Sequence, residues 1–312
     1  MKKKIVSIFG GTGFIGKYLV NSLLQNGYYV NVLSRNAQKK KKDITTFKLG
    51  QCRYFNCNIK DKKKIKEILV DSNIVINLIG LLINTKKNSF EDIHVQGLKN
   101  LVSVCKELKI EQIIHLSAIG ANDKSLSTYS QTKYRGEKVL KKFKNYTIIR
   151  PSIVYGDEDN FINLFAKMAK ISPFLPLIGK GATKFQPIWV QDLVNIILLT
   201  CNTKYLTNKL IEVGGQDIIS FKEIINAILD ELKLKRILIN IPFSIANNMA
   251  YFSEIFPKPF ITRDQVEMLK SNNIVSRNKD YRRYINYATQ PFNIMLTRQM
   301  ISHTTKGGHF SS

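Results

Sequence analysis

The chain has few cysteines, few acidic residues and no long apolar run, and each shortage excludes a class of protein. Only 4 of its 312 residues are cysteines, and Cys52 and Cys57 have no histidine or second cysteine pair at zinc spacing. We therefore predict no metal site, reduced thiols and a cytoplasmic location. The longest apolar stretch beyond the N-terminal strand, 74–83, contains Asn77 and is too short to span a bilayer. The opening MKKK is not followed by an unbroken apolar segment, so no signal peptide is expected.

Negative charge is scarce, because 23 acidic residues stand against 48 basic ones and the net charge is +25. Such a balance suits a nucleic acid, an anionic membrane surface or an acidic partner. The basic residues are scattered and form no stripe with interleaved aromatics, so we predict no nucleic-acid binding. Abundant lysine, isoleucine and asparagine also indicate an A/T-biased coding sequence, which would explain much of the charge. Peripheral association with an anionic membrane surface stays open.

A glycine-rich turn between a strand and a helix is the most informative feature of the sequence. The apolar run 5–9 ends in Gly10, Gly13 and Gly16, and an amphipathic helical pattern follows at once. Glycine permits positive φ and the close approach of a ligand, and the start of a helix attracts an anion. The pattern predicts a turn that holds the pyrophosphate of a dinucleotide. The residues expected to bind this cofactor here are Gly10, Thr12, Gly13, Phe14, Ile15 and Gly16.

Strand-like and helical patterns alternate through the first half of the chain. The predicted strands are 3–9, 29–33, 53–57, 74–79, 111–117 and 146–150, and the predicted helices are 14–26, 61–70, 90–108 and 128–143. This alternation predicts an α/β fold with a Rossmann-type, doubly wound parallel sheet.

The pattern changes after Pro151, which suggests a division into domains. We expect an NAD(P)-binding Rossmann domain over 1–155 and a smaller C-terminal α/β lobe over 156–276 that contacts a substrate or partner. A helix at 191–201 and a strand at 210–213 are predicted within this lobe. The polar, weakly periodic residues 277–312 are expected to form a poorly ordered tail.

The end of the second predicted strand bears on the choice of cofactor. A carboxylate there would bind the ribose 2′-hydroxyl of NAD, whereas Arg35 can make charge-assisted contacts with the 2′-phosphate of NADP. With Lys39–Lys42 close by and no acid before Asp43, the sequence favours NADP(H), and NAD(H) is the alternative. Arg35 could instead stack on the adenine or face solvent. At the end of the third strand, Asn58 and Ile59 are expected to bracket the adenine edge.

A tyrosine and a lysine four residues apart form the candidate catalytic pair. Tyr129 and Lys133 would lie on one face of a helix, where the ammonium lowers the pKa of the phenol. The phenol could then protonate a carbonyl oxygen as hydride leaves a nicotinamide. Ser117, at a predicted strand end twelve residues upstream, could orient the same carbonyl. Two further pairs share the spacing but have no such serine before them, namely Tyr134/Lys138 and Tyr205/Lys209.

These motifs resemble the short-chain dehydrogenase/reductase superfamily in its extended or atypical form. The resemblance rests on GGTGFIG (10–16), Ser117, YSQTK (129–133) and RPSIVYG (150–156). A narrower similarity, to the NADPH-binding accessory subunit of respiratory complex I and its bacterial relatives, covers about residues 1–275. It is carried by HLSAIGAN (115–122), YSQTKYRGE (129–137), the segment 150–179, KFQPIWVQDLVN (184–195) and TRDQVEMLKSNNIV (262–275).

The resemblance implies bound NADP(H) and, for the mitochondrial relatives, a structural role on complex I near the quinone site without electron transfer. Relatives elsewhere are linked to quinone metabolism. Complex I subunits or quinone-pathway proteins are therefore the expected partners, at the inner face of the respiratory membrane. The implied site residues are Gly10, Gly13 and Gly16 for the pyrophosphate, Arg35 for the 2′-phosphate, and Tyr129 and Lys133 for the nicotinamide ribose.

Two features depart from the family pattern. His94 stands where many members have an asparagine, which argues against a standard proton relay, and a lone histidine is more often structural. After Val275 the family pattern fades.

Two functions remain open. One is an NADP(H)-binding accessory or assembly protein. The other is an active reductase, dehydrogenase or epimerase that acts on a carbonyl or nucleotide-sugar substrate through Ser117, Tyr129 and Lys133.

Overall fold

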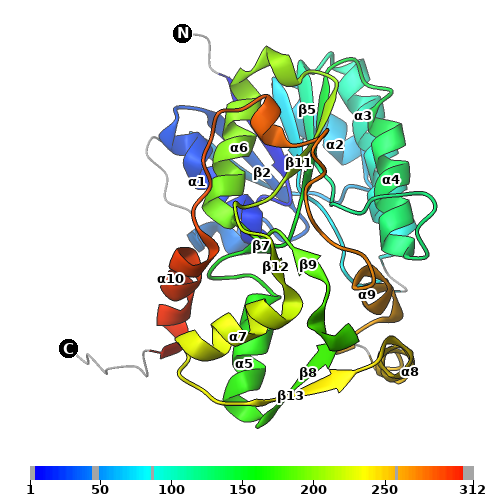
Figure 1. Cartoon of the computed structure of the whole chain (residues 1–312). Coiled ribbons are helices and arrows are strands. Elements are labelled where there is room, and N and C mark those ends of the chain that lie inside the picture. The colour runs from blue at the N-terminus through cyan, green and yellow to red at the C-terminus, as the bar shows by residue number, and fades with distance from the viewer. Residues whose placement is uncertain (1–3, 44–48, 86–87, 257–258, 305–312) are drawn as a thin grey trace. The chain divides into compact units, whose positions relative to one another are not determined.

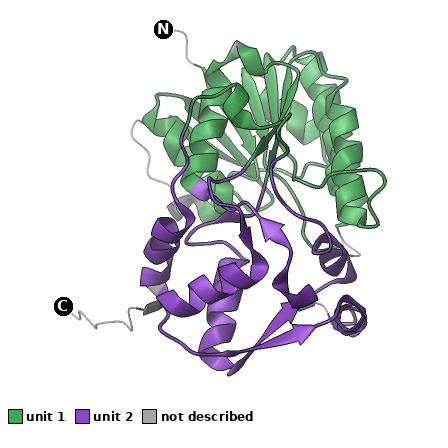
Figure 2. Ribbon diagram, viewed as in Figure 1, with its two compact units in different colours: residues 1–151, 191–213, 276–287 green, residues 152–190, 214–275, 288–312 purple. Residues whose placement is uncertain are grey.

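The chain divides into two compact units. The computed structural model describes residues 4–43, 49–85, 88–256 and 259–304 (Figure 1). Unit 1 comprises Met1–Pro151, Gln191–Val213 and Ser276–Tyr287, and unit 2 comprises Ser152–Val190, Gly214–Val275 and Ala288–Ser312 (Figure 2). The continuous ranges expected from the sequence, 1–155 and 156–276, are therefore corrected, because the chain returns to unit 1 twice.

A sheet of parallel strands forms the centre of unit 1. Its strands are β1 (Ile5–Phe9), β2 (Tyr29–Ser34), β3 (Cys52–Asn56), β4 (Ile74–Asn77), β5 (Gln112–Leu116), β6 (Tyr146–Pro151) and β11 (Lys209–Val213). The 7-stranded order is β3-β2-β1-β4-β5-β6-β11, with every neighbouring pair parallel. All residues of β4 and β5 are buried, as expected for strands covered on both faces. This order confirms the predicted Rossmann-type sheet.

The last strand of the sheet corrects the expected lobe boundary. β11 pairs with β6, and Ile211 lies opposite Ile149. The predicted strand 210–213 therefore extends the sheet and does not belong to the C-terminal lobe. Helix α6 (Val190–Asn202) leads into it, and the Gln191 Nε2 atom donates to Ser22 Oγ of α1 (Phe14–Gln25) at 3.1 Å.

Helices cover both faces of the sheet (Figure 1). α1 and α6 cover one face, while α2 (Lys62–Leu69), α3 (Gly97–Glu107) and α4 (Thr128–Leu140) cover the other. A buried apolar cluster, which includes Ile65, Leu101, Ile113 and Leu140, joins these last three helices to the strands. The predicted helix 90–108 is in fact a π-helix, η2 (Glu91–Gln96), that continues as α3. Short 3₁₀ segments are η1 (Gln38–Asp43), η4 (Lys204–Leu206) and η5 (Tyr281–Arg283).

Unit 2 is built from short strand pairs and helices. Its elements are β7 (Val154–Tyr155), α5 (Ile162–Ile171), β8 (Phe174–Ile178), η3 (Gly179–Gly181), β9 (Lys184–Phe185), β10 (Ile188–Trp189), β12 (Ile219–Ser220), α7 (Phe221–Glu231), β13 (Ile237–Ile241), α8 (Phe243–Ser253), α9 (Arg263–Met268) and α10 (Phe292–Thr304). Rings of Phe161, Phe165, Phe185 and Phe221 pack together at centroid distances of 5.2–6.4 Å. This aromatic cluster forms the core between α5, β9 and α7.

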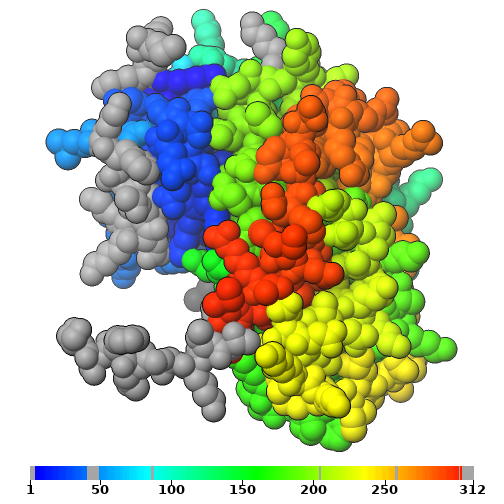
Figure 3. Space-filling model, turned by 60° about the vertical axis from the view of Figure 1, so that its left-hand side comes forward, coloured from blue at the N-terminus to red at the C-terminus, as the bar shows by residue number. Residues whose placement is uncertain are grey.

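The expected poorly ordered tail is wrong for its described part. Phe292, Leu296 and Met300 are buried along one side of α10, and the Phe292 ring lies 5.2 Å from that of Tyr155. The outer side of α10 lies at the surface (Figure 3) and carries Ile294. Residues 305–312 lie outside the described part of the chain. The four-residue spacing of the three buried side chains is a helical period, which the surrounding polar residues obscured.

The segment before α10 packs into unit 1. Tyr281 is buried, and its hydroxyl donates to Tyr287 O at 3.0 Å. The Tyr287 hydroxyl donates to Asp192 Oδ1 at 2.8 Å and accepts from Asn195 Nδ2 at 2.8 Å, both on α6. Buried tyrosines with satisfied hydroxyl groups therefore hold this polar segment in place.

Among the described residues, every helix is too short or too polar to cross a lipid bilayer.

We expect Leu296→Ala to lower the free energy of unfolding by about 2–5 kcal/mol, because it removes a buried side chain and leaves a cavity. Leu296 is 1% exposed, whereas Ile294 on the same helix is 58% exposed. Ile294→Ala should therefore change the free energy of unfolding by no more than about 0.5 kcal/mol. Urea denaturation followed by circular dichroism measures both variants. Equally small effects would contradict the packing of α10.

Candidate functional site

The glycine turn joins β1 to α1 through close backbone contacts. Gly10 has a φ of +81°, which side-chain-bearing residues rarely adopt, and its N–H donates to Leu33 O at 2.9 Å. The Gly13 N–H donates to Gly10 O at 3.0 Å and closes the turn. A Cβ on Gly16 would lie 2.3 Å from Gly10 O, so a side chain there would force the helix away from the turn.

The first turn of α1 suits an anion. Gly13 is the exposed N-cap, no side chain caps the helix, and the first turn carries no acidic residue. Uncapped N–H groups at a helix start carry partial positive charge. Phe14 and Ile15 are half-buried behind Gly13, while the buried Thr12 donates its hydroxyl to Ser34 Oγ at 2.9 Å. These residues fit the pyrophosphate of a dinucleotide, with Thr12 fastening the turn to the end of β2.

The residues predicted to recognise the adenosine half lie at the ends of β2 and β3. Arg35 directly follows β2 and is exposed, as is Lys39. Asn58 is also exposed, and its Oδ1 accepts from Lys60 N at 3.1 Å. The Ile59 side chain, in contrast, is 2% exposed and lies so close to α3 that a Cβ on Gly97 would come within 2.7 Å of it. Ile59 therefore belongs to the core, and its carbonyl accepts from Asn100 Nδ2 at 3.3 Å. The side chains of Lys41 and Lys42 lie outside the described part of the chain.

Helix α4 brings Tyr129 and Lys133 to one buried face. The helix begins at a Ser127 cap, whose hydroxyl accepts from Ser130 N. Lys133 Nζ donates to Leu116 O at the end of β5, at 2.8 Å. Burial lowers the pKa of Lys133 to about 8, although the nearby Glu137 carboxylate raises it. The ammonium is thus held by backbone at the carboxyl edge of the sheet, the edge on which the glycine turn also lies.

The hydrogen bonds of His94 define a structural role. Its Nε2 accepts from Leu81 N at 3.1 Å, so in the neutral ring the proton sits on Nδ1, which donates to Thr132 Oγ1 at 3.0 Å. Thr132 Oγ1 in turn donates to Tyr129 O at 3.0 Å. Burial, and secondly Lys133, lower the pKa of His94 to about 3. The neutral ring therefore ties the loop after β4 to α4.

The π-helix presses His94 against α4. A Cβ on Gly136 would lie 2.4 Å from His94 O, so the two backbones are in contact. The His94 ring stacks on Phe90 at 5.4 Å and meets the edge of the Tyr129 ring at 5.6 Å. Single π turns occur often at functional sites. Here the π turn supplies the packing that orients the Tyr129 ring.

Ser117 belongs to a buried ionic network instead of facing Tyr129 as a free donor. Its hydroxyl donates to Glu137 Oε1 at 2.5 Å. Arg150 makes a bidentate pair with the same carboxylate, through Nε at 2.8 Å and Nη2 at 2.7 Å. Arg150 Nη1 also lies 3.5 Å from Glu212 Oε1, and Ser276 N donates to Glu212 Oε2 at 2.9 Å. To orient a substrate carbonyl, Ser117 would have to withdraw its proton from a buried carboxylate.

Sequence reasoning missed Glu137, Arg150 and Glu212. A signal for the first was present, because Glu137 follows Lys133 by one helical turn and therefore shares its buried face. A carboxylate on the buried face of a helix requires a cationic partner, which the sequence alone does not identify. The partners come from β6 and β11, which the order of the strands brings together.

The burial of Lys133 predicts a pH-dependent stability. In the ligand-free protein Lys133 loses its proton near pH 8, whereas in the unfolded chain it keeps the proton to about pH 10.5. Between these values the unfolded state binds more protons, so the free energy of unfolding should rise with pH, by at most about 3 kcal/mol. Chemical denaturation at a series of pH values measures the rise. Lys133→Met is the control, and it should lack this rise while sharing the titrations of all other groups. Parallel pH profiles for the two proteins would contradict the burial of the amine.

Solved structures share the fold. An epimerase from Methanothermobacter thermautotrophicus superposes with a TM-score of 0.76 at 18% identity, over 96% of this chain and 93% of that one. A UDP-glucose 4-epimerase from Thermotoga maritima gives a TM-score of 0.74 at 17% identity, over 96% and 98% of the two chains. At these identities the likeness establishes the fold alone.

Sequence comparison identifies the family. Residues 6–214 match the NAD dependent epimerase/dehydratase family. The chain is 32% identical to NADH dehydrogenase [ubiquinone] 1 alpha subcomplex subunit 9 of Arabidopsis thaliana, over 88% of this chain and 71% of that protein. It is 34% identical to the subunit of that name from Dictyostelium discoideum, over 72% of this chain and 63% of the relative's length. The chain therefore belongs to the NAD dependent epimerase/dehydratase family, within the group that includes the mitochondrial alpha subcomplex subunit 9.

Proposed function

We propose that the chain is an NADP(H)-binding accessory protein of respiratory complex I, in which the dinucleotide is retained as a structural ligand. The observation that carries this proposal is the state of Ser117, whose proton is committed to the buried Glu137 carboxylate. The intact glycine turn supports nucleotide binding, and the bound Ser117 argues against a proton relay to a substrate. A ligand that binds only the folded chain stabilises it by mass action.

The preference for NADP(H) over NAD(H) rests on charge. Arg35 is exposed at the end of β2, and Lys39 and Lys40 follow it within the next turn. No acidic residue that could bind a ribose 2′-hydroxyl occurs between Arg35 and Asp43. A 2′-phosphate would gain charge-assisted hydrogen bonds here that NAD(H) lacks.

Arg35→Asp should weaken NADPH binding by about 10-fold or more, because a charge-assisted hydrogen bond contributes about 1.5–3 kcal/mol. NADH binding should change by no more than about 3-fold, since NADH carries no 2′-phosphate. Titration calorimetry measures both constants. The control is Lys63→Asp, which makes a charge reversal of the same size at an exposed site on α2. Equal losses for both nucleotides would show that Arg35 does not read the 2′-phosphate.

An exposed apolar surface on unit 2 supports association with a partner. Ile245, Met249 and Phe252 follow each other at helical spacing on α8 and are 53%, 48% and 63% exposed. The opposite side of the helix carries the buried Ala246 and Ala250. We call the full set the α8 surface, which consists of Ile245, Met249, Tyr251, Phe252, Ile255, Phe256 and Phe260. Exposed apolar side chains gathered on and just after one helix favour a protein contact.

The proposed partner is a subunit of complex I, because the relatives from Arabidopsis and Dictyostelium are named as subunits of NADH dehydrogenase. The chain spans only part of each relative, 71% and 63%, so the association is proposed for the portion held in common. Such a partner would place the chain peripherally on the inner face of the respiratory membrane. The high positive charge of +25 would favour an anionic surface there.

Affinity purification in mild detergent, followed by mass spectrometry, tests the association. The wild-type chain should carry NADPH and complex I subunits together. Met249→Ser/Phe252→Ser should lose about 10-fold or more of the co-purified subunits and keep its NADPH, because it removes apolar side chains at the centre of the α8 surface.

Ile294→Ser/Ile301→Ser is the matched control, because these isoleucines are 58% and 55% exposed on α10. It should retain both the nucleotide and the subunits. Absence of complex I subunits from the wild-type preparation would refute the association. Equal retention by both double variants would show that the α8 surface is not the docking site.

An active NADP(H)-dependent reductase, dehydrogenase or epimerase is the second candidate. The observation in its favour is Lys133, whose pKa of about 8 lies within the range of useful acid–base catalysis, on the same helix face as Tyr129. Its substrate would be a carbonyl compound or a nucleotide sugar, or a quinone. Turnover separates the two candidates. A chain that keeps NADPH but neither reduces a carbonyl or quinone nor epimerises a nucleotide sugar is not this enzyme, and turnover that Tyr129→Phe leaves unchanged does not use this pair.

A further inference from the structure

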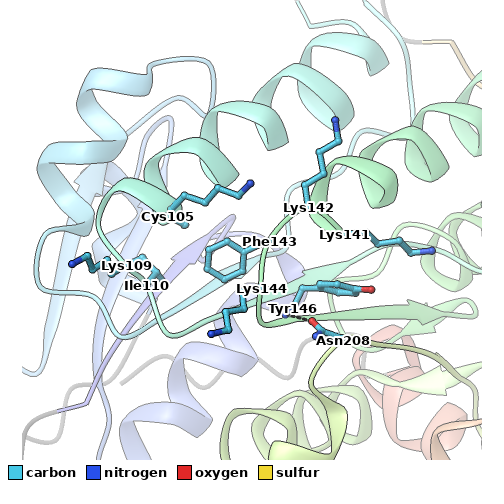
Figure 4. A pocket seen from close by; sticks show the side chains of 10 residues that line it. Cys105, Lys109, Ile110, Lys141, Lys142, Phe143, Lys144, Tyr146 and Asn208 are labelled. Carbon is cyan, nitrogen blue, oxygen red and sulfur yellow. Dashed lines mark hydrogen bonds between the residues drawn. The ribbon is translucent and has the colours of Figure 1, made fainter.

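A basic pocket opens at the amino-terminal edge of the unit 1 sheet. Its volume is about 710 Å³, and it lies between the C-terminal ends of α3 and α4 and the starts of β5, β6 and β11 (Figure 4). The glycine turn lies at the opposite, carboxyl-terminal edge of the same sheet. The pocket is therefore distinct from the nucleotide site. We call it the lysine pocket, after the lysines that line it: Lys106, Lys109, Lys141, Lys142 and Lys144.

The charges of the lysine pocket are not neutralised within the described chain. Glu107, beside Lys106, turns toward α2, where it pairs with Lys62 at 2.9 Å and Lys66 at 3.2 Å. Glu111 accepts from Asn73 Nδ2 at 2.7 Å. None of the five pocket lysines forms an ion pair with a described residue. The lysines of α2 that face α3 thus have a carboxylate partner, whereas the lysines of the pocket have none among the described residues.

The partial negative charge at the helix ends balances only part of the positive charge of the lysine pocket. Lysines near a helix C-terminus stabilise its partial negative charge, and α3 and α4 both end at the pocket. The two ends together supply about one negative charge, so about four positive charges are left over. The labelled lysines point in different directions around the Phe143 ring (Figure 4). Each side chain is exposed and flexible enough to turn toward a ligand.

We propose that the lysine pocket binds a ligand that carries several phosphate groups. A compact polyphosphorylated group brings enough negative charge into a volume of this size, and lysine binds phosphate as a point charge. A neutral donor supplements the lysines. The Asn208 side chain accepts from Tyr146 N through Oδ1, and its Nδ2 has no hydrogen bond with a described residue. The phosphates are those of a soluble phosphorylated compound or of an anionic phospholipid headgroup, and the two sources share this chemistry.

Binding of inorganic tripolyphosphate to the full chain tests the proposal. The titration is carried out calorimetrically with NADPH at saturation, so that the glycine turn is already occupied. Lys106→Gln/Lys142→Gln/Lys144→Gln should weaken binding about 10-fold or more, since each lysine contributes about 1 kcal/mol to the attraction. The control Lys63→Gln/Lys99→Gln/Lys124→Gln removes the same charge from exposed sites outside the pocket and should change binding no more than about 2-fold.

Vesicle sedimentation distinguishes the source of the phosphates. Phosphatidylcholine vesicles with and without phosphatidylinositol 4,5-bisphosphate, whose headgroup carries several phosphates, are compared for the wild type and both triple variants. Retention on the anionic vesicles alone, lost by the pocket variant and kept by the control, assigns a lipid headgroup. Tripolyphosphate binding without such retention assigns a soluble ligand. The proposal is overturned if the wild type binds neither probe, or if both triple variants lose binding equally, which would reflect net charge alone.

Discussion

The buried ion pair between Glu137 and Arg150 fixes the position of α4, and the candidate site depends on it. Two charge-assisted hydrogen bonds join the helix to β6, and Ser117 adds a third from the end of β5. Removing one partner of such a pair costs about 3–5 kcal/mol, because the other charge is left buried and unpaired. Lys133 and Tyr129 lie one and two turns before Glu137 on the same helix. Their position over the sheet is therefore set by an ionic contact.

The same constraint bears on what the site can do. A serine that donates to a buried carboxylate has no proton to offer a substrate, and His94 stays neutral between Leu81 and Thr132. What remains is the backbone turn at Gly10–Gly16, an exposed Arg35 and a buried Lys133. In the proposed function these groups retain a nucleotide, because a preorganised turn needs little ordering when a ligand binds.

The two edges of the sheet differ in how their charges are satisfied. At the carboxyl edge, Lys133 donates to Leu116 O and lies beside Glu137 within the fold. At the amino edge, the lysine pocket collects positive charge for which the described chain provides no acid. The difference arises from the residues that the helices carry to this edge. The ends of α3 and α4 are rich in lysine there, whereas the acidic Glu107 faces α2.

Local steric and periodic constraints made part of this structure readable from sequence alone. The turn at Gly10–Gly16 and the helix that pairs Tyr129 with Lys133 depend on neighbours a few residues apart, so their residue types already specify them. Contacts at long sequence separation decided the rest. Ser117 meets Glu137 and Glu212 meets Ser276 across 20 and 64 residues, and Ile59 turns into the core because Gly97 leaves room for it. The packing of α10 depends on Tyr155, far away in the sequence. Only the tertiary structure selects such partners, because many side chains could satisfy the same chemical need and the fold decides which of them come within reach.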